Sequence, residues 1–163
     1  MKHTDANAVL SIYQTGIDTG QAAFAEKAPD WFNWDQDHVE PCRLVIELEN
    51  SVVGWAALST VSTREVYRGI AEISIYIDTN HSGKGFGKLL MQALIKSAEH
   101  AGFWTLQAGI FRENIGSMKL HQFCGFKQLG VRQRPGKMTF GPLKGQWRDV
   151  VLMEYRSQVT GRD

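Results

Sequence analysis

The sequence predicts an α/β fold, a mixed β-sheet flanked by helices, in one domain that spans residues 1–163. Two observations indicate this class. First, hairpin patterns occur together with strand–helix–strand units, a mixture that is typical of mixed sheets. Second, residues 71–78 alternate like a half-buried strand, a glycine-rich loop follows, and residues 89–100 have the spacing of an amphipathic helix.

The N-terminal part of the chain is predicted to form two helices. Thr4 and Asp5 are candidate caps for a first helix that ends near Gly16. Pro29 and Asp30 suit the start of a second helix, because Pro is tolerated in a first helical turn and Asp is a favoured cap. Both helices precede the first predicted strand.

The rest of the chain is predicted to supply the sheet. Residues 43–48 and 52–59 are β-rich and are separated by the turn-forming link Glu49-Asn50-Ser51, which predicts an antiparallel hairpin. A polar connection then leads into the central strand. Strands are also predicted at 105–111, 126–134 and 147–156, with a short helix at 114–124 stopped by Gly125 and a long loop marked by Pro135-Gly136 and Gly141-Pro142.

Composition and charge exclude several classes of protein. A formal net charge of +1 gives no broad cationic field, so nucleic acid is not an expected partner and any anion site must be local. No apolar run approaches the roughly 20 residues that span a bilayer, and the first residues lack a signal-peptide core, so we expect a cytoplasmic protein without membrane contact. Cys42 and Cys124 are isolated, which predicts no disulfide framework and no metal site.

The glycine-rich loop is the candidate for such a local anion site. Gly83, Gly85 and Gly87 follow the central strand and open the next helix. Glycines bring the backbone close to a ligand, and the free amides and dipole of a helix N-terminus attract phosphate. Lys84 and Lys88 add positive charge at this place. The spacing fits neither the G-x-G-x-x-G fingerprint nor the G-x-x-x-x-G-K-[ST] loop.

These residues resemble the R/Q-x-x-G-x-G/A pyrophosphate loop of the GNAT superfamily of N-acetyltransferases. Gly85 and Gly87 fill the two glycine places, whereas Ser82 replaces the usual Arg or Gln. The chain is also similar, over most of its length, to the phosphinothricin and methionine sulfoximine acetyltransferases of that superfamily. The similar segments are Ile12-Tyr13, Gly16-Ile17, Gly54-Trp55-Ala56, Arg64, Tyr67, Glu72, Tyr76, Asn114, Ser117, Leu120-His121, Gly125-Phe126 and residues 145–150.

The resemblance implies a fold, a co-substrate and an assembly. Superfamily members have a central sheet whose two middle strands splay apart, and the gap receives the pantetheine arm of acetyl-CoA. They generally open with a β-strand, which is predicted to be short or absent here because only Met1 to His3 remain to form it. The sheet edge then needs cover from elsewhere, and the subfamily resemblance implies a homodimer. The implied cofactor-binding residues are Ile75, Tyr76, Ile77, Gly83, Lys84, Gly85, Phe86, Gly87, Lys88, Asn114 and Ser117.

Two residues are candidates for catalysis. Transfer of an acetyl group to an amine needs a neutral nitrogen, so a group must accept the proton that the amine loses. Glu72 is the candidate base, and it shares one strand face with Ser74 and Tyr76. His121 lies four residues before Gly125, where the wider superfamily has a tyrosine that protonates the departing thiolate. It is a candidate for the acid, or for a group that orients the amine.

Binding of the acceptor is assigned to the connection before the central strand and to the strand itself. Thr63, Arg64 and Tyr67 lie in that connection, and Glu72 and Ser74 on the strand. An arginine fork suits the carboxylate of an amino acid, although a surface ion pair near Glu65 is an equally good explanation of Arg64. The aromatic residues Trp31, Phe32 and Trp34 are predicted to be buried packing residues rather than an acceptor pocket.

The sequence therefore predicts an acetyl-CoA-dependent N-acetyltransferase that acts on the α-amine of a small amino acid or analogue, such as phosphinothricin or methionine sulfoximine. Two alternatives remain open. In the first, the enzyme acetylates another amine, such as a peptide N-terminus or an antibiotic. In the second, the chain is an acyl-CoA-binding module without catalysis. The presence of Glu72 and His121 favours an enzyme.

Overall fold

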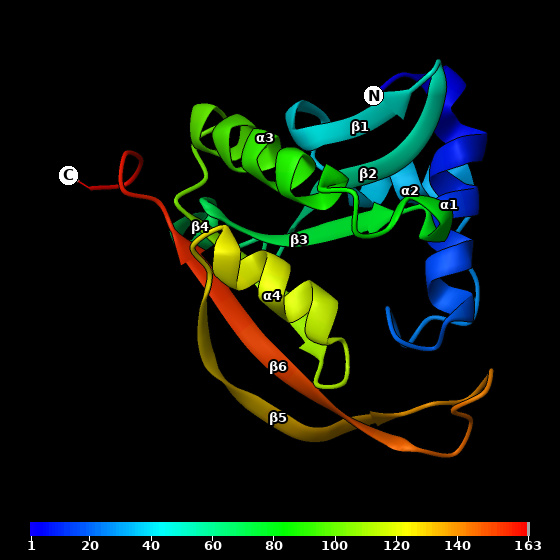
Figure 1. Cartoon of the computed structure of the whole chain (residues 1–163). Coiled ribbons are helices and arrows are strands. Elements are labelled where there is room, and N and C mark those ends of the chain that lie inside the picture. Colours follow the sequence, from blue (N-terminus) through cyan, green and yellow to red (C-terminus); the bar gives the residue numbers. More distant parts are fainter. Residues whose placement is uncertain (163) are drawn as a thin grey trace.

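Six strands form one mixed sheet in the computed structural model, which describes residues 1–162 (Figure 1). The strands follow the order β1-β2-β3-β4-β6-β5 across the sheet. Neighbouring strands are antiparallel except β3 and β4, which are parallel. The predicted α/β class with a mixed sheet is thus confirmed. The bounds are β1 (Arg43–Leu48), β2 (Ser51–Thr60), β3 (Ile70–Ile77), β4 (Thr105–Phe111), β5 (Lys127–Lys137) and β6 (Trp147–Arg156).

Four α-helices flank the sheet, and short 3-10 turns precede several elements. No strand precedes α1 in the part of the chain that the structure describes, which confirms that the first strand is absent. The second helix begins where Asp30 predicts, since the Asp30 carboxylate accepts a hydrogen bond from the Asn33 amide at 2.9 Å. The helices are α1 (Ala6–Asp18), α2 (Trp31–Asp37), α3 (Phe86–His100) and α4 (Ile115–Phe123), and the 3-10 turns are His3–Asp5, Glu40–Cys42, Glu65–Tyr67 and Thr79–His81.

Helices cover both faces of the sheet, and strand β2 shows how its sequence serves both. Ala56 and Leu58 belong to the core under α3, whereas Trp55 and Ala57 belong to a second core with α1 and α2. All four residues are fully buried. Side chains alternate along a strand, so a run buried on two faces must be apolar throughout. Figure 1 shows α3 and α4 on one face and α1 and α2 on the other.

The sheet opens at its centre, between β3 and β4. Only three residue pairs join these strands, and the last of them is Glu72 with Gln107. Beyond this pair, β3 continues beside β2 alone and β4 beside β6 alone. The two halves of the sheet therefore diverge, and the predicted splay of the central strands is confirmed.

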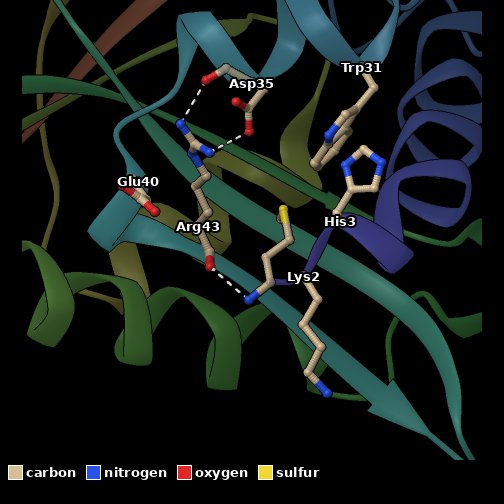
Figure 2. A pocket seen from close by; sticks show the side chains of 7 residues that line it. Lys2, His3, Trp31, Asp35, Glu40 and Arg43 are labelled. Atoms are coloured by element: carbon tan, nitrogen blue, oxygen red, sulfur yellow. Dashed lines mark hydrogen bonds and ion pairs between the residues drawn. The ribbon is translucent and has the colours of Figure 1, made fainter.

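The free edge of β1 is covered by the N-terminal residues and by α2. The amino group of Met1 donates to the carbonyl oxygen of Arg43 at 3.2 Å. The Arg43 guanidinium reaches α2, where it bonds the carboxylate and the carbonyl of Asp35 at 2.6 and 2.7 Å (Figure 2). A small hollow of about 230 Å³ between these groups contains Trp31 and Glu40. These contacts supply the cover that the edge of β1 was expected to need.

Two expectations about individual residues were wrong. Phe32 is 70% exposed, so it is not a packing residue, although Trp34 is fully buried as predicted and Trp31 is half-buried against it. The pair Pro135-Gly136 lies inside β5 and not in a loop. Because β5 is an edge strand and its register shifts between Arg132 and Gly136, a residue without an amide hydrogen is tolerated there.

Candidate functional site

A cleft of about 1180 Å³ occupies the gap where β3 and β4 separate. Its lining includes residues from both faces of the sheet, because side chains alternate along each strand. Ile75 and Ile110 belong to the α3 side, whereas Tyr76 and Val150 belong to the α1 side. The cleft therefore passes through the sheet and joins its two faces.

Most of the predicted site residues are gathered around this cleft. Lys84 and the three connection residues Thr63, Arg64 and Tyr67 do not contribute to its lining. The predicted residues that do are Glu72, Ser74, Ile75, Tyr76, Ile77, Gly83, Gly85, Phe86, Gly87, Lys88, Asn114, Ser117 and His121.

The glycine-rich loop forms one end of the cleft. Gly83 and Gly85 have φ angles of +76° and +85°, and an added Cβ at either would meet nothing within 4 Å. Backbone conformation, and not lack of space, requires glycine here. Lys88 and Leu89 are the first α3 amides to bond Gly85 O, at 3.1 and 3.3 Å, so the amides before them are available to an anion. The Lys88 ammonium lies 3.9 Å from the ring centroid of Phe123.

Glu72 lies at the point where the sheet opens. Its carboxylate faces β4 at a position without a side chain, since an ideal Cβ on Gly109 would lie 3.9 Å from Glu72 Oε1 and 3.2 Å from Val150 Cγ1. Glu72 is exposed in the cleft, and it takes part in none of the ion pairs found within residues 1–162. A carboxylate in this state is available to accept a proton from a ligand.

His121 lines the cleft from α4 and is only 2% exposed. Its Nδ1 lies 2.8 Å from the carbonyl oxygen of Ser117, which can only accept, so Nδ1 carries the hydrogen. The other ring nitrogen, Nε2, is buried without a hydrogen-bond partner in the described residues. Burial lowers the pKa of His121 below its ordinary value, although the bond to Ser117 opposes this. The neutral ring therefore presents Nε2 as an acceptor.

Arg64 lies on an exposed turn outside the cleft. Its guanidinium carbon is 5.2 Å from the ring centroid of Tyr67, which is itself 41% exposed. The ion pair in this connection is made by Arg68 with Glu65, at 3.0 Å, and not by Arg64. Among the residues that the structure describes, the guanidinium of Arg64 therefore lacks the surface ion pair that was its alternative explanation.

Sequence reasoning missed two groups of cleft residues. Arg132 on β5 lines the cleft, although nothing in its sequence context distinguished it from the other arginines of the C-terminal part. The irregular segment between α1 and α2 also lines it, and no periodic pattern could have placed that segment. Its lining residues are Thr19, Gln21, Ala22, Ala23 and Phe24.

Tyr13 is a further lining residue, and it contacts Tyr76 with ring centroids 4.7 Å apart. Burial raises the pKa of both phenols above their ordinary value. Both hydroxyls therefore stay protonated at neutral pH, and the wall they form beside the opening is uncharged. Charge in the cleft is left to the carboxylate of Glu72 and to cations such as Lys88 and Arg132.

This geometry defines a class of protein. An anion-binding loop, a sheet that opens at its centre and a free carboxylate at the opening agree with a match of residues 10–126 to the acetyltransferase (GNAT) family. The chain belongs to this family and is an N-acetyltransferase that uses acetyl-CoA. No group of His, Cys, Asp or Glu within residues 1–162 is arranged to hold a metal ion, and none of the helices there is long and apolar enough to cross a membrane.

Three known proteins illustrate the similarity. The phosphinothricin N-acetyltransferase of Alcaligenes faecalis is 32% identical over 94% of this chain and 79% of its own length. The L-methionine sulfoximine/L-methionine sulfone acetyltransferase of Pseudomonas aeruginosa is 28% identical over 92% of this chain and 88% of its own. The structure of yncA from Salmonella typhimurium with its cofactor acetyl-CoA superposes with a TM-score of 0.85 at 26% identity, and covers 100% of this chain and 95% of that one.

The first prediction concerns the glycine-rich loop. Gly85→Asp places a carboxylate at the N-terminal end of α3, where the phosphate groups of the cofactor are expected to bind. It also requires a residue with a Cβ to adopt a positive φ angle. We expect the KM for acetyl-CoA to rise about tenfold or more, which corresponds to roughly 1.4 kcal/mol. Gly102→Asp is the matched control, since Gly102 has φ +88° and equally open surroundings but lies outside the cleft. Equal effects of the two substitutions would show that the loop does not bind the cofactor.

The second prediction concerns the protonation of His121. Long-range proton–nitrogen NMR at neutral pH should show hydrogen on Nδ1 and none on Nε2, with a titration midpoint below the usual value of about 6.5. The unfolded chain then binds more protons than the folded one below about pH 6.5, so the free energy of unfolding should fall as the pH is lowered from there. His121→Gln should lose this part of the pH dependence. Hydrogen on Nε2, or a higher midpoint, would instead support a proton-donating role.

Proposed function

We propose that this enzyme acetylates the α-amine of a small amino acid or analogue of the phosphinothricin or methionine sulfoximine type. The observation that supports this most directly is the position of Glu72. It is the last paired residue of β3 before the sheet opens, so its carboxylate lies at the junction of the two faces. A thioester that enters from the α3 face and an amine that enters from the α1 face meet beside it.

In this proposal the α3 face of the sheet binds acetyl-CoA and the α1 face binds the acceptor amine. Acetyl-CoA supplies the acetyl group as a thioester. The amides of the loop from Gly83 to Gly87 and the Lys88 ammonium bind its pyrophosphate, and Ile75 to Ile77 bind its pantetheine arm along the unpaired part of β3. Asn114 and Ser117 complete this side at the start of α4, where Asn114 caps the helix by accepting from the Ser117 amide at 3.1 Å.

Glu72 then acts as the general base. The amine nitrogen attacks the thioester carbonyl, the new N–C bond forms as the C–S bond breaks, and the proton that nitrogen loses passes to the Glu72 carboxylate. Coenzyme A leaves as its thiolate and takes a proton from solvent. His121 orients the reactants through its Nε2 acceptor, which is a better match to its hydrogen bonding than the role of acid. Ser74 lies two residues from Glu72, on the same side of β3, and lines the acceptor half with it.

Two arginines are candidates for the acid group of the acceptor. Arg132 lines the cleft, and the register from Arg132 to Val150 and from Val150 to Phe111 places it on the face that carries Glu72. Arg64 is exposed with Thr63 and Tyr67 on the connection before β3, and it makes none of the ion pairs found within residues 1–162. A guanidinium fork binds a carboxylate or phosphinate with paired hydrogen bonds, so either residue suits an acidic acceptor.

The third prediction tests the acceptor class by release of free thiol from acetyl-CoA. Phosphinothricin and methionine sulfoximine should react faster than their carboxamides, because the amides lack the charge that an arginine recognises. Arg132→Ala or Arg64→Ala should remove this preference, and the variant that does so identifies the clamp. If free acid and amide react equally well with the wild-type enzyme, recognition of the carboxylate is excluded, and the acceptor is recognised by another feature.

Glu72→Gln is the control for catalysis in the same assay. It keeps the shape of the side chain but cannot accept the proton, so turnover should fall by roughly 10²–10⁴-fold while the KM for acetyl-CoA is unchanged. Turnover close to that of the wild type would assign the proton to another group. The Glu72→Gln variant tests turnover, whereas the carboxamides test recognition of the acceptor. Failure of one test therefore leaves the other informative.

We also propose that two copies of the chain associate through the hairpin of β5 and β6. This hairpin contains exposed apolar side chains, with Leu129 61%, Val131 39% and Trp147 55% exposed. The outer edge of β5 has no neighbouring strand in the sheet of residues 1–162. Apolar side chains beside an open edge strand favour association with another chain.

The fourth prediction follows from this surface. Sedimentation of the wild-type protein at assay concentration should give about twice the 18.3 kDa of one chain. Leu129→Lys combined with Trp147→Lys should shift the protein to one chain, since each replaces an exposed apolar side chain of the hairpin by a charge. Phe32→Lys is a suitable control, because Phe32 is 70% exposed on α2 and lies outside the hairpin. A wild-type protein that sediments as a single 18.3 kDa species would disprove the association.

A further inference from the structure

The wall of the cleft on the acceptor side is built from a segment without regular structure. Residues 19–24 follow α1 and contribute five residues to the lining, and they lie on the face of the sheet that carries Glu72. Phe24 packs edge-on against Phe111 of β4, with ring centroids 4.8 Å apart. It also covers Gly136 of β5, where an added Cβ would lie 2.7 Å from the Phe24 ring. A side chain must hold such a segment, because no helix or sheet ladder does.

Arg148 on β6 provides that attachment. It is only 2% exposed, and its guanidinium donates from Nη1 to the carbonyl of Gly20 and from Nη2 to the side chain of Gln21, both at 2.7 Å. The guanidinium also stacks on Phe111, with 4.2 Å from Cζ to the ring centroid. Arg148 and Gly20 are 128 positions apart in the sequence, so only the tertiary fold brings them into contact.

The charge of Arg148 is balanced from a third element. Nη2 also bonds Glu113 Oε2 at 2.9 Å, and Glu113 precedes α4. Burial raises the pKa of the Glu113 carboxyl, but the hydrogen bonds that this carboxyl accepts and the positive charge of Arg148 together outweigh burial, so the pKa lies below its ordinary value. Next to Glu113, the side-chain Nδ2 of Asn114 donates to the carbonyl oxygen of Gln21 at 3.1 Å. A buried charge is costly unless it is paired, so the buried Arg148 guanidinium requires its hydrogen-bond partners. These include residues 20 and 21, which are thereby held in place.

We propose that Arg148 is a positioning residue for the acceptor: it holds residues 19–24 against β4 and β6 and thereby sets the shape of the acceptor wall. Arg148 itself does not line the cleft, so it acts through Gly20 and Gln21 and not by contact with the substrate. This inference deepens the proposed function, because it names what determines acceptor selectivity. The same network reaches α4 through Asn114, so the acceptor wall is tied to the helix that carries His121.

The test compares Arg148→Met with Arg148→Lys and a matched control. Met keeps the unbranched apolar stem of the side chain but loses the three hydrogen bonds and the charge, so the KM for phosphinothricin should rise about tenfold or more, as expected for a displaced binding wall. The KM for acetyl-CoA should change less than about twofold, because the glycine loop is untouched. Lys keeps the charge without the fork, and should give an intermediate increase.

Arg156→Met is the control on the same strand. Arg156 also donates to backbone carbonyls, at 3.1 Å to Trp104 and 2.9 Å to Thr160, but it lies at the other end of β6 and outside the cleft. Both KM values should stay at the wild-type level in this variant. If Arg148→Met fails to fold, Glu113→Gln removes only the countercharge and should raise the phosphinothricin KM by a smaller factor. Equal increases in both KM values would overturn the proposal and leave Arg148 a purely structural residue.

Hydrogen exchange separates this inference from the proposed acceptor class. The amides of residues 19–24 should exchange faster in Arg148→Met than in the wild type, while those of α3 keep their protection. This readout needs no substrate, so it remains decisive if wild-type enzyme releases no thiol with phosphinothricin. Unchanged exchange in the segment would overturn the positioning role whichever amine the enzyme accepts.

Discussion

The short parallel pairing between β3 and β4 is the constraint on which the rest of the structure depends. Three residue pairs hold the two halves of the sheet together, and past Glu72 the backbone groups on the facing edges have no partner strand. Buried backbone groups need hydrogen bonds, so an opened sheet is stable only where a ligand or water completes the pairing. The opening therefore offers unpaired backbone groups to a ligand that has amide groups, and Glu72 is the last paired residue of β3 before it.

Much of the fold follows from local patterns in the sequence. The bounds of β4 and β6 agree with the predicted 105–111 and 147–156, because their apolar residues have clear periodicity and their ends have clear breakers. Pro135-Gly136 was misread as loop because the same residues serve in an edge strand, and whether a strand lies at the edge is a property of the whole sheet. Phe32 was misread because apolar character alone does not say which face of a short helix is covered.

The residues of the candidate site likewise divide into those that a local motif predicts and those that only the tertiary fold brings together. Residues of the loop from Gly83 to Lys88 could be predicted because their chemistry lies in consecutive positions. The acceptor wall could not, because Phe24 and Arg132 come from segments that meet only after the sheet has formed. The tautomer of His121 was equally hidden, since it depends on the distance from Nδ1 to one carbonyl oxygen. Local motifs thus predict the residues that we propose for the cofactor, whereas tertiary packing decides which residues line the proposed acceptor side.

The aromatic core beneath α1 gives the protein an internal optical reporter. Trp55 stacks on Tyr76 with ring centroids 4.9 Å apart, and Trp34 meets Trp55 edge-on at 5.4 Å. Both indoles are fully buried, whereas Trp147 is 55% exposed, so their emission occurs at shorter wavelength than that of Trp147. Because Tyr76 also lines the cleft, a ligand that moves this ring changes the surroundings of Trp55 directly. We therefore expect a ligand that moves Tyr76 to change the intrinsic fluorescence, without any attached dye.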